Sequence, residues 1–291
     1  LCLLDAIRQN PIQPWPDAQI LLDMFEDAAD VADESVSLLN GGTEARYRAA
    51  GVVSWSQTEL YSQIAPLELA GGGTLFYSGG RLGYKAASYS APAYTLSDVL
   101  DDAPLQYVSM PSARDIPRAL TVSYTRPQRE YETAEMPAIT VRGGEGTEAS
   151  LDLSMVFSAS QARRLQAIAA ARYAAQTSIS CTAPPSAFVC QPGTTVTADI
   201  DGLEHMDGTY TVLTANPGLW LADMEGDSGG VAMRVPLTMQ AEASSFYDWT
   251  AATDELGVVA PPAPLEDVAL TFDGSTRAVD AHRDVPEDSS S

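Results

Sequence analysis

Residues 151–199 read LDLSMVFSASQARRLQAIAAARYAAQTSISCTAPPSAFVCQPGTTVTAD, and this stretch decides the fold. A β-type run at 151–157 leads into one helix at 158–175, and a second β-type run follows at 177–183. Ser158 is the natural N-cap of that helix. Gln161 stands three residues later, where its side chain can reach back and complete a capping box.

One stripe of this helix recurs at helical spacing and is expected to face the interior. Its members are Leu165, Ile168, Ala169 and Arg172. Arg163 and Arg164 are expected to remain in solvent. Because no reactive group lies on the expected buried face, we interpret the helix as a packing element between strands of a β-rich domain.

The composition indicates a globular, turn-rich chain. Its 291 residues suffice for two domains or one large β-rich domain, and 45% of them are apolar, so a core can form. The 19 prolines and 21 glycines favour short strands and many turns over long helices. No apolar run is long enough to span a membrane. Leu1 is not an initiator Met, so we expect a processed product or part of a longer chain.

The formal net charge of −23 comes from 16 basic and 39 acidic residues. Such a field repels nucleic acid and anionic membranes, because phosphate contacts need cations. We therefore expect no stable nucleic-acid binding. Lys85 is the only lysine, which fits a GC-rich genome better than adaptation to salty water.

Three cysteines are too few for a disulfide framework. A bridge between Cys181 and Cys190 is conceivable, but two buried reduced thiols fit better. Neither they nor Cys2 has the spacing of a zinc site.

Residues 1–90 predict a compact α-β-β-α-β-β module with helices on one side of an antiparallel sheet. A second capping box, Ser54 with Gln57, is expected to open its last helix. The expected helices span 1–9, 16–29 and Ser54 to the glycines at 71–73, and the expected strands span 35–39, 45–53, 75–77 and 81–84.

Residues 91–250 predict β-rich domains of barrel or sandwich type with the helix at 158–175 inserted. Residues 251–291 contain the Pro-rich linker 261–264, a strand-like piece at 268–272 and an acidic tail expected to be disordered. Within 91–250, the other expected strands are 94–96, 105–110, 119–124, 194–200, 208–214, 218–224 and 230–242, and the expected loops are 126–136 and 143–146.

The string GDSGG at 226–230 matches the sequence around the nucleophile of trypsin-like proteases. A serine nucleophile needs a histidine base with an orienting acid. His205 and His282 are the only histidines, and neither lies upstream, as the trypsin order requires. We interpret residues 227–230 as a turn between two strands.

Other candidate sites are also weak, so we predict no catalytic, cofactor-binding or metal-binding residue. The glycines at 71–73 and 79–80 match no phosphate-binding motif. Two acidic groups, Asp199 with Asp201 and Glu204, and Asp223 with Glu225 and Asp227, offer oxygens for calcium but fail the EF-hand pattern. Carboxylates are plentiful, but nothing in the sequence marks two of them as the buried acid pair of a glycosidase. The aromatics Trp55, Tyr61, Tyr77 and Tyr84 are expected to pack in the core.

Several stretches together resemble one family. These are EARYRAAGVV at 44–53, GTLFYSGGRL at 73–82, the LDL…S…QARRL segment at 151–165, and Tyr247-Asp248-Trp249 followed by Pro-rich sequence. Their order and spacing over residues 15–265 are similar to those of the tail-tip attachment (protein J-like) hub of long-tailed phages and the related tail proteins of gene transfer agents.

The resemblance implies a non-enzymatic virion component at the tail tip. Members of that family form a homotrimeric baseplate hub that closes the distal tail tube, contacts the distal tail protein and the tape-measure protein, and often carries host-recognition domains. The residues themselves leave two alternatives open. One is a host-receptor binding module, and the other is a tail-associated carbohydrate-degrading enzyme.

Overall fold

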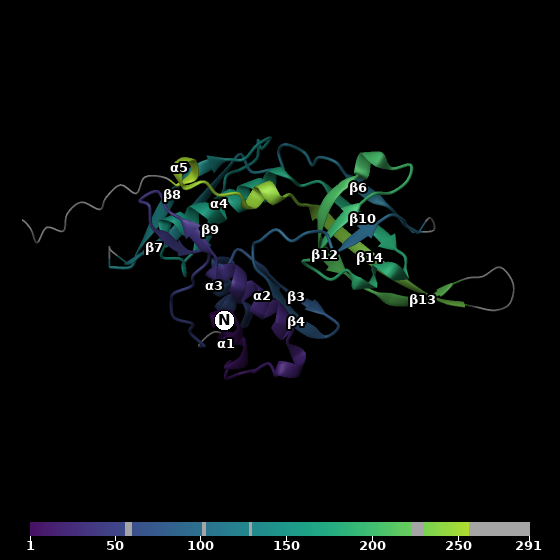
Figure 1. Ribbon diagram of the computed structural model, residues 1–291, viewed down its shortest axis with the longest axis horizontal. Helices are drawn as coiled ribbons and strands as arrows, with labels where there is room; N and C mark the ends of the chain where they lie inside the picture. Colours follow the sequence, from purple (N-terminus) through teal and green to yellow (C-terminus); the bar gives the residue numbers. More distant parts are fainter. Residues whose placement is uncertain (56–59, 101–102, 128–129, 223–229, 256–291) are drawn as a thin grey trace, which may run out of the picture. The chain divides into compact units, whose positions relative to one another are not determined.

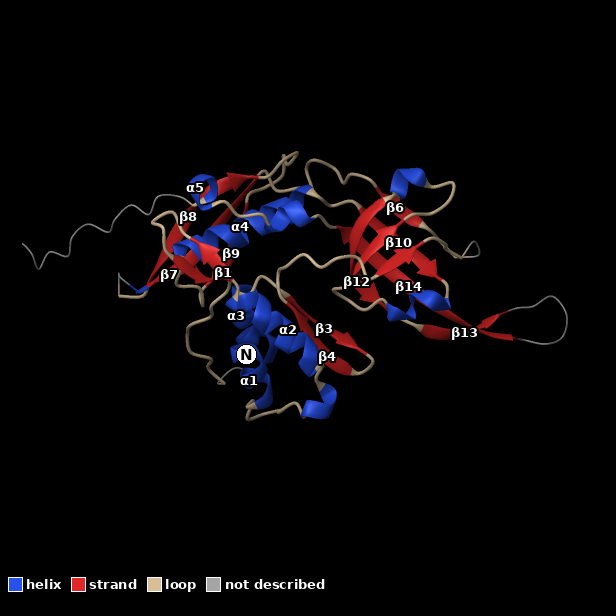
Figure 2. Ribbon diagram, viewed as in Figure 1, coloured by secondary structure: helices blue, strands red, loops and turns tan. Residues whose placement is uncertain are grey.

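A computed structural model describes residues 1–291 except 56–59, 101–102, 128–129, 223–229 and 256–291 (Figure 1). The chain divides into residues 1–257 and residues 258–291, and the description concerns the first unit. The described residues form five α-helices and fourteen strands. Figure 2 shows helices in blue and strands in red. The expected mixed α+β, β-rich fold class is confirmed.

The N-terminal elements follow the predicted α-β-β-α-β-β order. They are α1 (Cys2–Arg8), the 3₁₀ turn η1 (Asp17–Gln19), α2 (Leu22–Asp33), β1 (Ser35–Ser37), β2 (Thr43–Ala45), α3 (Leu60–Ala70), β3 (Thr74–Ser78) and β4 (Arg81–Lys85). β1 pairs with β2 and β3 with β4, both antiparallel, but they form two separate two-stranded sheets, so the prediction of one antiparallel sheet in this part is wrong.

Two of the predicted bounds in this part are wrong. The helix expected from residue 16 begins at Leu22, because Pro16 caps a separate 3₁₀ turn and Ile20 is extended. The strand expected at 45–53 ends at Ala45, and Arg46 and Tyr47 instead donate their N–H groups to the carbonyls of Glu34 and Ala32. Gln57 of the second capping box lies outside the described residues.

A three-stranded sheet in the order β8-β7-β9 packs against α4 (Ala159–Ala174). β7 (Ala119–Arg126) pairs antiparallel with β8 (Glu132–Thr140) and parallel with β9 (Ala149–Leu153). The loop expected at 126–136 is wrong, because residues 132–136 lie in β8. Most side chains of this strand are exposed, so a polar sequence is tolerated there. Among residues 132–136, Met136 alone is buried.

A seven-stranded sheet makes the other β layer and curls like half of a barrel (Figure 2). Its order is β5-β11-β12-β14-β10-β6, with β13 on β14. The bounds are β5 (Tyr94–Leu96), β6 (Gln106–Val108), β10 (Ser178–Ala183), β11 (Thr195–Ala198), β12 (Gly208–Ala215), β13 (Gly218–Ala222) and β14 (Gly230–Ala241). The short 3₁₀ turns η3 (Pro185–Val189) and η4 (Glu204–Met206) join them, and η5 (Ser244–Tyr247) and α5 (Ala251–Asp254) follow β14.

The buried apolar side chains form two large clusters. One contains side chains from α1, α2, α3, β4, β7, β9 and α4, so residues far apart in sequence share it. The other lies within the seven-stranded sheet and includes Ile179, Val196 and Met239, all fully buried. Helix α4 therefore packs beside the N-terminal elements as well as on its own sheet.

Candidate functional site: a polar junction at helix α4

Helix α4 begins with the predicted cap, and its cap side chain has a second role. Ser158 Oγ accepts a hydrogen bond from Gln161 N at 3.2 Å. The Gln161 side chain does not return to Ser158, which corrects the capping-box prediction. It accepts from Arg48 N at 3.0 Å and donates to Arg48 O at 3.0 Å and to Ala70 O at 2.8 Å. Because this amide is 1% exposed, it ties the N-terminal backbone to α4.

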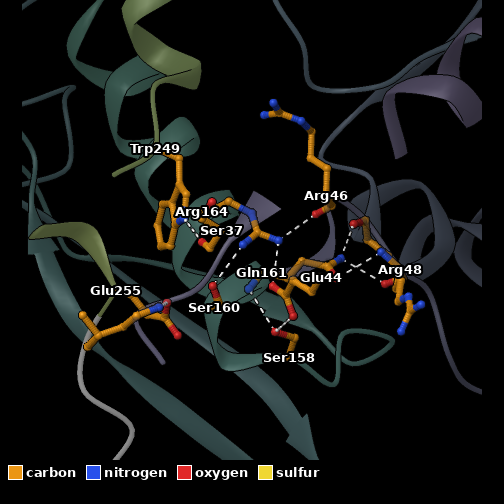
Figure 3. A network of polar contacts seen from close by, with 12 residues as sticks. Ser37, Glu44, Arg46, Arg48, Ser158, Ser160, Gln161, Arg164, Trp249 and Glu255 are labelled. Carbon is orange, nitrogen blue, oxygen red and sulfur yellow. Dashed lines mark hydrogen bonds and ion pairs between the residues drawn. The ribbon is translucent and has the colours of Figure 1, made fainter. Parts of the chain in front are cut away.

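Arg164 is buried, and the expectation that it lies in solvent is wrong. Its residue exposure is 3%, and Nη2 donates to Glu44 Oε1 at 2.9 Å and to Arg46 O at 2.8 Å (Figure 3). Nη1 donates to Ser160 Oγ at 3.0 Å. Arg164 lies three residues after Gln161 on the same helical face, so the face that carries the buried amide also carries the guanidinium.

The ion pair at this junction joins a buried guanidinium to a partly exposed carboxylate, and Arg164 Nε is buried without a hydrogen-bond partner among the described residues. Burial lowers the pKa of Arg164, and the Glu44 carboxylate opposes that shift. Glu44 accepts a second bond, from Ser158 Oγ at 2.8 Å, so the carboxylate links the helix cap to the arginine. Burial also raises the pKa of the adjacent Tyr47 to about 12, with Arg46 and Arg164 opposing it.

The segment that follows β14 and Glu242 lies against this junction. Residues 244–255, here called the exit segment, contain no buried residue. The Trp249 ring lies 5.3 Å from Arg164 Cζ, and its Nε1 donates to Ser37 O at 3.1 Å (Figure 3). Glu255 Oε2 accepts from Leu39 N at 2.6 Å. Polar and cation–π contacts hold this segment, together with the packing of Tyr247 against the first core cluster.

A second arginine of α4 holds the same segment. Arg172 Nη2 donates to Tyr247 Oη at 3.0 Å, and Arg172 Cζ lies 5.8 Å from the Tyr247 ring. The Tyr247 hydroxyl donates to Glu242 Oε2 at 3.2 Å, at the end of β14. Arg172 also donates to Gly72 O at 3.3 Å. One helix therefore joins the N-terminal elements, the seven-stranded sheet and the exit segment.

The polar groups of the junction bind and position one another. The junction contains a guanidinium, a carboxylate, an amide and hydroxyl groups that bond one another, and no thiol, histidine or lysine pairs with them among the described contacts. The sequence assigned Gln161 to a helix cap and Arg164 to solvent, and it gave no indication that both bond the segment around Glu44. The sequence pattern that indicates this site is the pair of polar side chains at 161 and 164, which share a helical face with the apolar Ile168.

Most of the sequence-derived candidate residues lie outside the described part of the chain. Residues 226–229 of GDSGG, the group at Asp223, and His282 lie outside the described residues. His205 packs edge-on to Tyr107, with ring centroids 5.3 Å apart. Within the described ranges, no group of three or more His, Cys, Asp or Glu side chains is placed to hold a metal ion.

The cysteine prediction is confirmed. Cys181 and Cys190 are buried, unbridged thiols, and burial raises the pKa of each to about 11. Cys2 is exposed.

The aromatic prediction is half wrong. Tyr84 is buried and donates to Glu68 O at 3.1 Å, and Trp55 is partly buried against the core. Tyr61 and Tyr77 are 63% and 61% exposed, because they lie on the outer sides of α3 and β3. None of the helices in the described part of the chain has the length and hydrophobicity that crossing a bilayer requires.

Comparisons with known proteins place this architecture. A family model described as "Putative phage tail protein" matches residues 59–214, more than half of the chain. The comparison with curated proteins gives no match. A chain from the solved "Virion of native gene transfer agent (GTA) particle" has a TM-score of 0.52 at 15% identity, over 84% of this chain and 56% of that one. The present chain thus spans little more than half of that relative.

Two bacterial tail proteins are also similar. The tail protein from Neisseria meningitidis MC58 has a TM-score of 0.45 at 12% identity, over 77% of this chain and 68% of that one. The 43 kDa tail protein of prophage MuSo2 from Shewanella oneidensis has a TM-score of 0.40 at 14% identity, over 62% and 54%. At these identities, the likeness to the gene transfer agent chain shows a shared fold. From the family match over residues 59–214, the chain belongs to the family of putative phage tail proteins.

Proposed function

We propose that this chain is a structural hub component of the tail tip of a long-tailed phage or gene transfer agent. In that role it closes the distal tail tube and joins it to host-recognition parts. The observation that supports this most is the fold shared with a gene transfer agent virion chain over 84% of the present chain. Family membership and the J-like order of sequence motifs agree with it.

The proposed hub is a non-enzymatic homotrimer in contact with the distal tail protein and the tape-measure protein. The junction at α4 supports a role in force-bearing connection, because it fastens the exit segment to the core at Arg164 and at Arg172. We also propose the division into a hub module at 1–90, β-rich hub domains at 91–250 and a linker with tail at 251–291.

The acidic surface suits a passage for DNA. Helix α2 exposes Asp23, Glu26, Asp27 and Asp30, and no base lies within it. We propose that such faces line or flank the tube, where like charge keeps DNA from adhering. Reversing these four charges to lysine should slow DNA ejection, and unaltered ejection would contradict this part of the proposal.

The experiment that tests the hub role is deletion of the gene in its phage or gene transfer agent producer. We expect particles whose tails lack the distal closure, together with loss of infectivity or transfer that the intact gene restores. Complete tails with normal infectivity would refute the proposal.

The two alternatives predict other results. A receptor-binding module should adsorb to host cells as the purified chain and block infection. A carbohydrate-degrading enzyme should turn over host polysaccharide. A hub core should do neither.

A further inference from the structure

The end of the exit segment, residues 248–255, lies on the fold without entering its core. None of these residues is buried, and Trp249 is absent from the side chains that form the core clusters or pack against them. Tyr247, one residue earlier, does pack against the first core cluster. Burial therefore holds the start of the exit segment more firmly than residues 248–255, here called the strap.

Tyr247 fixes the point from which the strap starts. Its hydroxyl accepts from Arg172 Nη2 at 3.0 Å and donates to Glu242 Oε2 at 3.2 Å. The next residue, Asp248, is exposed and has an extended backbone. A rotation of the backbone at Asp248 would move the strap away from α4 and leave the anchor at Tyr247 in place.

The strap makes its own short-range hydrogen bonds. Asp254 Oδ2 accepts from Thr250 N at 2.7 Å, and Asp254 N donates to Thr250 O at 2.9 Å. Thr253 Oγ1 also donates to Thr250 O, at 3.2 Å. Because these bonds join residues within the strap, α5 and its flanking residues can move as one piece without breaking them.

The strap meets the rest of the fold through polar and cation–π contacts. These are Trp249 Nε1 with Ser37 O, the Trp249 ring with Arg164, and Glu255 Oε2 with Leu39 N. In addition, burial lowers the pKa of Arg163 and the Asp254 carboxylate opposes that shift, so these two charges attract each other. Contacts of these kinds are weak where water competes for them.

One buried group beside the Trp249 ring is left without a partner. Arg164 Nε has no hydrogen-bond partner among the described residues, although Nη1 and Nη2 of the same guanidinium both donate. The ring lies 5.3 Å from Cζ, the carbon that carries Nε (Figure 3). A buried donor without an acceptor is unfavourable by an amount similar to what a cation–π contact contributes. The closed strap is therefore close to balance at this point.

The strap also covers the outer edge of β1. The inner edge pairs with β2, and Leu38 N donates across that hairpin at 2.9 Å. Backbone groups of alternate residues point to opposite edges of a strand, so those of Ser37 and Leu39 point outward. Trp249 supplies a donor to Ser37 O, and Glu255 supplies an acceptor to Leu39 N. Without the strap, this edge would be open to pairing with another extended segment.

We propose that residues 248–255 form a strap that opens as one unit about Asp248, and that its opening exposes both the Arg164 guanidinium and the outer edge of β1. The chain continues beyond Glu255, so a pull on that continuation reaches Glu255 first and Tyr247 last. The strap thereby converts a load on the following chain into an accessible strand edge. This device is a property of the isolated chain and does not rest on the proposed hub role, so failure of either leaves the other standing.

The test is residue-resolved hydrogen exchange of the full chain, measured by NMR. Three hydrogens report on opening, namely the Leu39 amide, the Trp249 indole N–H and the Arg164 Nε–H. Because one motion exposes all three, we expect their protection factors to agree within about threefold. The neighbouring Leu38 amide is bonded on the inner edge, so we expect it to be at least about tenfold more protected.

One variant and a matched control make the outcome specific. Glu255→Ala removes the contact furthest from Asp248. It should accelerate exchange of all three hydrogens by a common factor of about ten, although Glu255 bonds Leu39 and not Arg164. Glu148→Ala is the control, because this carboxylate also accepts a short bond, from Arg118 at 2.7 Å, and lies outside the strap. It should leave the three rates unchanged.

Three results would overturn the proposal. One is a spread of more than about threefold among the three protection factors, because separate fluctuations rather than one opening would then expose these hydrogens. Another is a Leu38 amide no better protected than that of Leu39, which would show that the whole hairpin opens. The third is a response to Glu255→Ala that is absent, confined to Leu39, or matched by Glu148→Ala.

Discussion

Replacement of Arg164 by methionine tests whether the polar junction stabilises the fold. The change removes donors to Glu44, Arg46 O and Ser160 Oγ, and it leaves without its cation a carboxylate whose side chain is only 19% exposed. Removing one partner of a buried pair costs about 3–5 kcal/mol. Because Glu44 keeps its bond from Ser158 and some solvent contact, we expect a loss of about 3 kcal/mol, at the lower end of that range.

The assay is urea unfolding of the parent chain, of Arg164→Met and of a control variant, with the midpoint and the slope fitted separately. An exposed ion pair of similar length supplies the control. Arg118 and Glu148 lie 2.7 Å apart with side chains 64% and 51% exposed, so Arg118→Met should cost about 0–1 kcal/mol. The contrast between the two substitutions then measures burial rather than loss of an arginine.

A double-mutant cycle separates the ion pair from the rest of the junction. Replacing both Arg164 and Glu44 by methionine removes both charges, so the double variant should be more stable than the sum of the single losses predicts, by about 2 kcal/mol. A cost of Arg164→Met below about 1 kcal/mol, or strictly additive losses, would refute the reasoning.

Three further predictions concern other parts of the fold. Gly72 has φ +57°, and an added Cβ would meet Leu165 Cδ2 at 2.5 Å, whereas Gly79 has the same φ and open space around it. Thermal unfolding should therefore show Gly72→Ala destabilised by about 3 kcal/mol and Gly79→Ala by about 1 kcal/mol, and equal losses would contradict this. Burial raises the pKa of Cys181 and Cys190 from 9.0 to about 11, so the folded state retains protons that the unfolded state releases. The contribution of these thiols to the free energy of unfolding should be complete below pH 9 and should fall as the pH rises to 11. The fall should be less steep in a variant with both cysteines replaced by alanine. Urea unfolding midpoints measured between pH 9 and pH 11 check this. Trp249→Ala should increase amide hydrogen exchange in residues 244–255 with little change elsewhere, and protection equal to that of the parent would show that Trp249 does not hold the segment.

Much of the fold follows from local sequence patterns. The cap at Ser158 and the alternation at 178–183 fix a helix and a strand because both depend on neighbours in the chain. The hairpin of β3 and β4 follows from the glycines at its turn. Elements without such local signals were mispredicted. β8 has a polar sequence, and its pairing with β7 supplies the stability that its own side chains do not.

The junction shows why the site was harder to predict than the fold. Burial of Arg164 depends on Glu44, which lies 120 residues earlier, and on Trp249, which comes much later in the chain. A local sequence pattern does not predict contacts between residues so far apart in the chain. The spacing of residues 161 and 164 on one helical face was readable, but an arginine at that position is exposed in most helices. The exposure of Tyr61 and Tyr77 likewise depends on tertiary packing, because a residue is exposed when no other element of the fold covers it.

Mass photometry of the purified chain, followed by negative-stain imaging of the main species, tests the proposed hub most directly. The account predicts a species of three times the 30.8 kDa of one chain, with three-fold symmetric ring images. A species that stays at the mass of one chain at every concentration would contradict it.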